Sequence, residues 1–128
     1  MTDALADTSV FIAEEQDRPM ERHRVPAQLS VSIVTVGELR AGVLVADDAE
    51  DRGQRLRTLE VALGFDPLPI DQQVAEVWAR LRVQLRQRGR RMPVNDSWIA
   101  ATAMALGIPV VTQDDDYAGI DGLEVIRV

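Results

Sequence analysis

Short apolar runs alternate along the chain with longer stretches in which apolar residues recur at helical spacing. The runs that predict strands are 4–12, which passes into a turn where Thr8 or Ser9 caps a helix, 29–33, 108–112 and 123–128. The stretches that predict helices are 34–45, 52–63, 71–88 and the segment from Asp96 to Gly107. Strands and helices that alternate in this way form a mostly parallel sheet covered on both faces. We therefore expect an α/β fold of three layers, with all 128 residues in a single domain, 1–128.

The predicted helices are amphipathic, and their apolar stripes indicate which faces are buried. The expected stripes are Leu56, Leu59 and Leu63; Val74, Val77, Trp78, Leu81 and Leu85; and Ile99, Ala103 and Leu106. Between helices, the acidic residues 47–51 predict a solvated loop, and the prolines of 65–70 predict an extended connector. The polar segment 14–24 holds the only histidine, His23, so the chain lacks the pair of imidazoles that metal-free RNA cleavage needs.

The composition narrows the chemistry that the chain can carry. It has no cysteine and no lysine, which excludes thiolate metal sites, Schiff-base catalysis and phosphate binding by a P-loop lysine. No apolar run is long enough to span a membrane, and Asp3 and Asp7 interrupt the first one, so we expect no signal peptide and a cytoplasmic protein. The net charge of −7 weighs against a nucleic-acid partner, unless positive charge is concentrated locally, and it leaves a basic partner open.

Four acidic residues occupy places that a parallel sheet brings together. Asp7 and Asp114 follow predicted strands, while Asp96 and Glu38 lie near the starts of helices. In an open α/β sheet these positions surround the crevice beyond the carboxyl ends of the strands, where ligands bind. Simpler interpretations stay open for each residue alone: a helix cap for Asp96, a turn for Asp7 and Asp114, and a helix-dipole contact or an arginine partner for Glu38.

Taken together, these acids favour a divalent cation. Adjacent carboxylates raise one another's pKa and are costly to hold together unless a cation lies among them. With oxygen ligands alone the expected cation is Mg²⁺ or Mn²⁺, because zinc prefers histidine or cysteine. Since Mg²⁺ keeps bound water and contacts substrate phosphates, the matching reaction is phosphodiester hydrolysis.

Four motifs, taken in order, resemble those of a known family. They are Asp7-Thr8-Ser9, Gly37-Glu38-Leu39, the segment 95–103 (NDSWIAATA) and the segment 111–117 (VTQDDDY). In order and spacing they extend over essentially the whole chain, and they resemble the PIN-domain ribonucleases, specifically the VapC toxins of bacterial toxin–antitoxin pairs. The resemblance implies a PIN-like fold of three α/β/α layers.

The resemblance also implies roles for individual residues. The acidic quartet, catalytic and metal-binding, would be Asp7, Glu38, Asp96 and Asp114, with Asp7 and Asp96 the firmest ligands. Asp116 matches a further acidic position, so the fourth ligand is Asp114, Asp116 or shared between them. Thr8, Asn95 and Thr112 would orient carboxylates or water.

An activity and partners follow from the same resemblance. It implies an Mg²⁺-dependent endoribonuclease, with Mn²⁺ as a substitute, that cuts structured RNA such as tRNA or ribosomal RNA and inhibits translation. It implies a VapB-type antitoxin whose C-terminal segment crosses the crevice, and a homodimer within a larger toxin–antitoxin complex. Two alternatives stay open: a non-catalytic acidic module that binds a basic partner, and an Mg²⁺ phosphohydrolase acting on other substrates.

Positive charge is concentrated in one segment. All fourteen basic residues are arginines, and six of them lie between Arg80 and Arg91. Because guanidinium binds phosphate through paired hydrogen bonds, we expect RNA binding by Arg86, Arg88, Arg90 and Arg91. The simpler alternative is a charged face that only keeps the helix soluble.

Overall fold

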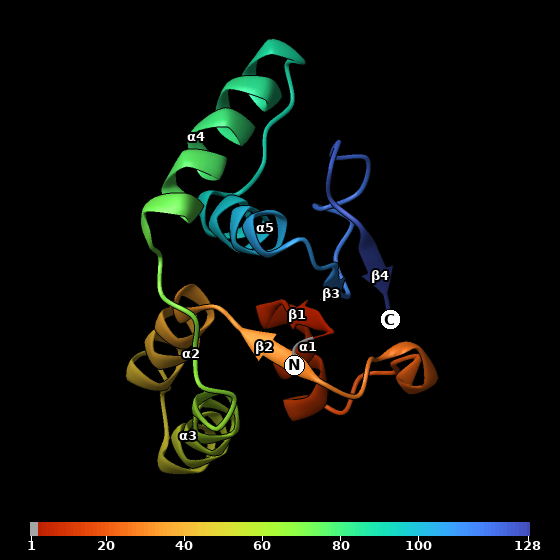
Figure 1. Ribbon diagram of the computed structural model, residues 1–128. Helices are drawn as coiled ribbons and strands as arrows, with labels where there is room; N and C mark the ends of the chain where they lie inside the picture. The colour runs from red at the N-terminus through yellow and green to blue at the C-terminus, as the bar shows by residue number, and fades with distance from the viewer. Residues whose placement is uncertain (1–2) are drawn as a thin grey trace.

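A parallel sheet lies at the centre of the computed structural model, which describes residues 3–128 (Figure 1). Within those residues the sheet has four strands in the order β2–β1–β3–β4, and each pairing is parallel. The strands are β1 (Ala4–Ala6), β2 (Leu29–Val31), β3 (Val110–Thr112) and β4 (Val125–Arg127). Their carboxyl ends therefore share one edge, and the prediction of a mostly parallel sheet is confirmed.

Helices cover both faces of this sheet. They are α1 (Thr8–Glu15), α2 (Ile33–Leu44), α3 (Ala49–Leu63), α4 (Gln72–Gln87) and α5 (Val94–Leu106), with a short 3-10 turn at Arg22–Arg24. Successive strand residues point to opposite faces. Thus Leu5 packs in a core with side chains of α4 and α5, whereas Ala6 packs with side chains of α1, α2 and α3. The expected three layers are confirmed, and Figure 1 shows α5 and α1 on opposite sides of the strands.

None of the helices within residues 3–128 combines the length and the hydropathy needed to cross a membrane. The connector 65–70 runs as predicted: Leu68 forms a parallel bridge with Ser32, and this bridge lies just beyond the end of β2.

Side-chain caps begin four helices and correct two predictions. The first helix, α1, begins at Thr8, because the carboxylate of Asp7 accepts a hydrogen bond from the Ser9 amide. Asp7 is therefore the cap, and the prediction of Thr8 or Ser9 was wrong. Likewise Asp48 caps α3, so three of the five residues of the predicted 47–51 loop are helical. Ser32 and Asp71 cap α2 and α4.

The start of α5 differs from the other four. Pro93 occupies its cap position and supplies no side-chain hydrogen bond, and Asp96 lies in the first turn. The cap interpretation of Asp96 is therefore wrong. The first N–H groups of a helix have no partner within it, so the first turn of α5 carries partial positive charge next to the Asp96 carboxylate.

Three leucines expected in buried stripes are exposed instead. Leu56, Leu63 and Leu106 are 36%, 43% and 50% exposed. In α3 the fully buried positions are Leu59 and Ala62, so a narrower stripe faces the core than the leucine spacing suggested. These misassignments arise because a helix with one covered side can leave large apolar residues in water.

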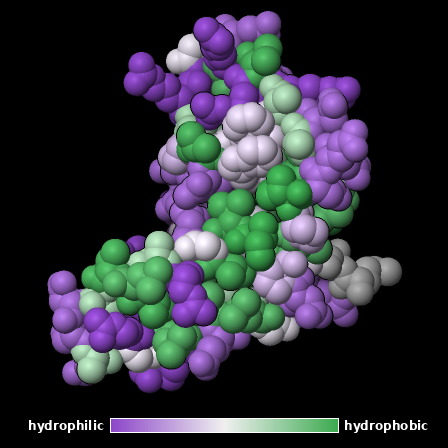
Figure 2. Space-filling model, turned by 90° about the vertical axis from the view of Figure 1, so that its left-hand side faces the viewer, coloured by the Kyte–Doolittle hydropathy of each residue, from purple (hydrophilic) through white to green (hydrophobic). Residues whose placement is uncertain are grey.

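An exposed apolar surface covers much of one side of the molecule. Figure 2 shows apolar side chains gathered over the middle and lower parts of that face and hydrophilic ones at its upper end. Exposed apolar residues of the elements on this side include Ile33, Leu44 and Val94, which are 43%, 73% and 54% exposed. Contiguous apolar surface of this kind is typical of a protein-binding site.

Candidate metal centre

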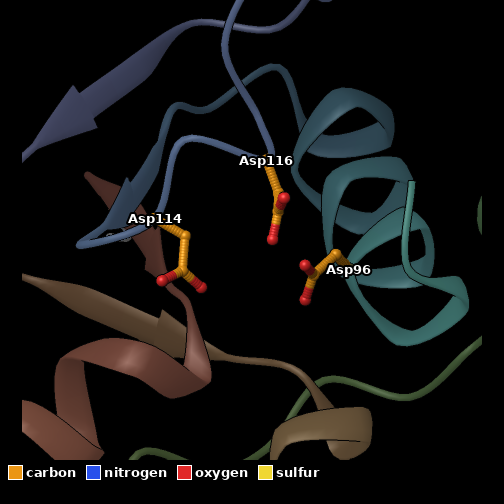
Figure 3. A group of neighbouring side chains, drawn as sticks. All are labelled: Asp96, Asp114 and Asp116. Carbon is orange, nitrogen blue, oxygen red and sulfur yellow. The ribbon is translucent and has the colours of Figure 1, made fainter. Parts of the chain in front are cut away.

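Three carboxylates converge at the carboxyl edge of the sheet. Asp96 comes from the first turn of α5, and Asp114 and Asp116 come from the loop that follows β3. One carboxylate oxygen from each lies within 4.8 Å of the others. Figure 3 shows the three side chains extending from the helix and the loop toward a common space. The fold thus brings together three acids that are up to twenty positions apart in the chain.

The pKa of Asp96 shows that these carboxylates are unfavourable to hold together in their charged forms. Partial burial and the neighbouring carboxylates of Asp7, Asp116 and Glu38 raise the pKa of Asp96 from 3.8 to about 7. Burial is the largest cause, because it penalises the charged form. Without a cation, the site therefore retains a proton near neutral pH.

The pKa of Asp114 is also raised, but two nearby arginines partly offset the effect. Burial and the charges of Asp7 and Asp116 raise its pKa, while Arg127 and Arg18 act in the opposite direction. The Asp114 amide donates to the Thr112 hydroxyl at 2.9 Å, which ties the acidic loop to the end of β3.

Asp7 is almost fully buried, 1% exposed, and is held by several donors. Its Oδ2 accepts hydrogen bonds from the Ser9 hydroxyl at 2.7 Å and the Thr112 hydroxyl at 2.9 Å, besides the longer bond from the Ser9 amide. Its Oδ1 accepts from the Tyr117 hydroxyl at 2.8 Å. Asp7 is outside the group of three, but its charge acts on both Asp96 and Asp114.

Glu38 borders the site from α2. Its Oε1 accepts a hydrogen bond from the Thr8 hydroxyl at 2.7 Å, and that hydroxyl shares another at 2.8 Å with buried Thr35. Glu38 and Asn95 line one groove of about 490 Å³ between α2 and α5. Thr8 thus contacts a candidate carboxylate, as Thr112 does, whereas Asn95 is an exposed residue at the rim.

Sequence reasoning missed two of the donors that hold Asp7, Ser9 and Tyr117. Ser9 was considered only as a helix cap, and Tyr117 only as part of a motif. Ser9 also connects α1 to the loop after β3, because its hydroxyl accepts a hydrogen bond from the backbone amide of Gln113 at 3.0 Å. A hydroxyl two residues beyond an acid at a strand end, and a tyrosine after an acidic run, are the signals that could have identified them.

The arginine segment separates into two parts. Arg82, Arg86, Arg90 and Arg91 line a groove of about 730 Å³ at the end of α4; we call these four residues the arginine groove. Arg88 is not in this groove: it pairs with Asp121, which is exposed. Arg90 also donates to the Asp116 carbonyl at 2.8 Å, so the arginine groove directly contacts the loop that carries two of the clustered acids.

The donor set fits a hard divalent cation. The clustered ligands are carboxylate oxygens, which Mg²⁺, Mn²⁺ and Ca²⁺ prefer, and no histidine or cysteine is among them. A cation at this point would favour the charged form of Asp96 and reverse the rise in its pKa. The raised pKa and the convergence of the carboxylates are thus both explained by a metal centre.

Comparisons with known proteins agree with this geometry. Residues 4–123 match the sequence profile of the PIN domain. The chain is 48% identical to "Ribonuclease VapC5" of Mycobacterium tuberculosis, over 95% of this chain and 93% of that protein. It is 50% identical to "Ribonuclease VapC4" of the same species, over 98% of this chain and 96% of that one. A crystal structure of VapBC-5 from M. tuberculosis, a member of the VapBC family of toxin–antitoxin systems, superposes with a TM-score of 0.91 at 44% identity, covering 100% of both chains.

Proposed function

The chain belongs to the VapC group of the PIN-domain family, and from this premise we propose that it is a metal-dependent endoribonuclease toxin controlled by an antitoxin. The proposed cofactor is Mg²⁺, with Mn²⁺ as a substitute. The proposed substrate is structured RNA, such as tRNA or ribosomal RNA, whose cleavage inhibits translation in the cytoplasm. The observation that carries the proposal is the convergence of Asp96, Asp114 and Asp116 at the carboxyl edge of the sheet.

Asp96, Asp114 and Asp116 would hold the cation, with Asp7 beside them and Glu38 at the border. A bound divalent cation supplies a water of lowered pKa and stabilises negative charge on the leaving oxygen. Because Asp96 retains a proton near neutral pH, it must release that proton before its carboxylate can become a ligand. Thr112 anchors both Asp7 and the Asp114 amide, and Thr8 orients Glu38.

The arginine groove supports a polymeric, phosphate-rich substrate. It concentrates four guanidinium groups on a molecule whose net charge is −7. Through Arg90 it adjoins the loop of Asp116, so a nucleic acid bound there would pass beside the carboxylates. Local positive charge next to an acidic metal site suits an RNA chain better than a small phosphate ester.

The exposed apolar surface and the acidic crevice support an antitoxin partner. The structural relative is a member of the VapBC family of toxin–antitoxin systems. A VapB-type C-terminal segment would place apolar side chains over α2 and basic ones near Glu38, in the groove between α2 and α5. Burial of Leu44 and Val94 would favour such docking. The proposed assembly is a homodimer within a larger toxin–antitoxin complex.

Cleavage of total cellular RNA by antitoxin-free protein tests the proposal. We expect discrete fragments with Mg²⁺ or Mn²⁺, none with EDTA, and a loss of at least about 100-fold in rate for Asp96→Asn, because a metal ligand is removed. Mapping the fragment ends would identify the RNA, and added antitoxin should suppress cleavage.

Asp115→Asn is the matched control for this assay. Asp115 lies between Asp114 and Asp116 but is exposed, pairs with Arg127 and is outside the carboxylate cluster. The control should cleave at the parent rate. A folded parent protein that cuts no RNA with any divalent cation would refute the nuclease, and binding of a basic partner would then identify an acidic binding module. Cleavage of DNA or small phosphate esters in preference to RNA would refute the proposed substrate.

A further inference from the structure

Tyr117 is a buried side chain whose ring and hydroxyl serve different purposes. The residue is 0% exposed, and its ring packs in the core with side chains that include Leu5, Ile99 and Ile120. A phenylalanine could provide that packing. The hydroxyl instead donates to Asp7 Oδ1 at 2.8 Å, and no feature of the apolar core requires that contact.

The two oxygens of Asp7 are used unequally. Oδ2 accepts hydrogen bonds from the Ser9 amide, the Ser9 hydroxyl and the Thr112 hydroxyl. Oδ1 accepts one, from Tyr117. A carboxylate oxygen offers about two lone pairs. Among the hydrogen bonds of residues 3–128, Oδ2 is therefore saturated, and Oδ1 is the oxygen with capacity for a further partner.

We propose that Tyr117 is a positioning residue of the metal centre, whose hydroxyl holds Asp7 so that its Oδ1 is presented to the cation. The inference rests on the metal centre of the proposed function. Tyr117 is suited to this task because its fully buried ring is fixed by the core, which holds the hydroxyl in place beside Asp7 Oδ1. Asp7 is buried, so a carboxylate that loses this donor can turn away from the cation.

The position of Tyr117 in the chain strengthens the inference. It follows Asp116 directly, so a single loop supplies two clustered acids and the donor that holds a third acid. That loop is fixed at its other end by the bond from the Asp114 amide to Thr112, a residue that also donates to Asp7. Tyr117 and Thr112 thus hold the two oxygens of Asp7 from either end of one short segment.

Binding of Mn²⁺ to Tyr117→Phe, measured by calorimetry without RNA, tests the role of the hydroxyl. Loss of a donor that orients a metal ligand typically weakens metal affinity tenfold or more, so we expect Kd to rise by at least about tenfold. Thr102→Val is the matched control, since it removes a hydroxyl that is equally buried, in α5, and bound to the Trp98 carbonyl. The control should bind Mn²⁺ like the parent protein.

A second measurement does not depend on how well the variant folds. Tyr117 is the only tyrosine in the chain, so labelling with 3-fluorotyrosine gives one ¹⁹F resonance from this position. We expect that resonance to shift during a Mg²⁺ titration and to saturate with the metal site. An unshifted resonance, or a Tyr117→Phe Kd within twofold of the parent, would overturn the inference while the metal centre stands. A parent protein that binds no Mn²⁺ would overturn both.

Discussion

At the scale of single residues, the site is a set of acids that are costly to hold together. Asp96 shows this most clearly, because burial and three neighbouring carboxylates raise its pKa to about 7. A cation relieves the cost, and without one the folded protein retains a proton that the unfolded chain gives up. The free energy of unfolding of the metal-free protein should therefore depend on pH, and replacing Asp96 should remove that dependence.

The sign of that dependence follows from the two pKa values. The unfolded chain releases the Asp96 proton near its ordinary pKa of 3.8, and the folded protein releases it near 7. Between these values the folded state binds more protons, so raising the pH from about 4 to about 7 should lower the stability of the metal-free protein. Asp96→Asn should remove this decline and melt several degrees higher than the parent at a pH of about 7.5 in EDTA.

Thermal melts in EDTA between about pH 4.5 and 8 measure this difference. Asp115→Asn, in the same site region but exposed, should follow the parent curve. Parent and Asp96→Asn curves that stay parallel over the whole range would contradict the assignment. Added Mn²⁺ should stabilise the parent and leave Asp96→Asn nearly unchanged, because only the parent has the complete ligand set.

The acids of the site and the hydroxyls of Thr8 and Thr112 could be predicted from the sequence, but the hydroxyls of Ser9 and Tyr117 could not. Asp96, Asp114 and Asp116 flank predicted element ends, and parallel pairing alone brings such ends to one edge. Tyr117 contacts Asp7 across 110 positions, and only the packing of its ring determines where its hydroxyl points. The ligand roles of Asp7 and Glu38 stay predictions, since both lie beside the three clustered carboxylates.

At the scale of elements, α4 braces the first turn of α5, which has no side-chain cap of its own. The Trp78 indole N–H donates to the buried Ser97 hydroxyl at 2.9 Å, and that hydroxyl donates to the Val94 carbonyl. The rings of Trp78 and Trp98 stack at 4.1 Å between centroids, 3° from parallel. Arg82 donates to the Met92 carbonyl just before the helix. This support stands directly beside Asp96.

Two substitutions at Trp78 should separate these contributions. Trp78→Phe keeps an aromatic ring but removes the N–H donor, and should lower the free energy of unfolding by about 1 kcal/mol. Trp78→Ala also removes the stack and should cost about 3 kcal/mol. Urea denaturation measures both. In a double-mutant cycle with Ser97→Ala, effects that simply add would show that the hydrogen bond contributes nothing.

Element order was predicted well because hydrophobic spacing determines it, whereas boundaries depended on single polar side chains. Apolar residues continue past the first strand because Val10 and Phe11 fill the buried face of α1, so hydrophobic spacing alone does not mark where the strand ends. What ends the strand is the cap formed by Asp7, and the sequence offers Thr8 and Ser9 as equal candidates. Only the geometry of the turn decides among them.

At the scale of the whole molecule, positive and negative charges gather at different places, in the arginine groove and in the carboxylate cluster. A protein of net charge −7 places four arginines in one groove, while Arg88 turns to Asp121. Arg88 differs from the other three arginines predicted to bind RNA, because it lies outside the arginine groove and pairs with Asp121, and a sequence pattern cannot separate it from its neighbours. Arg90 also holds the Asp116 carbonyl, so its replacement would disturb the metal centre as well.

The salt dependence of RNA binding tests the arginine groove. Replacing Arg86 and Arg91 by glutamine should weaken binding and flatten the slope of log K against log salt. The slope should change by about 0.7 for each phosphate of single-stranded RNA that the variant no longer neutralises. Arg88→Gln is the matched control, from the same segment but outside the groove, and should keep the parent slope. Equal slopes of log K against log salt for the parent and both variants would show that the arginine groove does not bind RNA and only keeps the protein soluble.

The stacked indoles of Trp78 and Trp98 also provide an intrinsic spectroscopic probe. The chain has two tryptophans, and both belong to this one pair, so tryptophan emission arises at a single place. Rings this close together couple their electronic transitions, so the tryptophan signal depends on the geometry of the pair. Trp98 lies two positions from Asp96. Arrival of a cation, an RNA chain or an inhibitory peptide at the acidic edge can thus be followed by light, in real time, on unmodified protein.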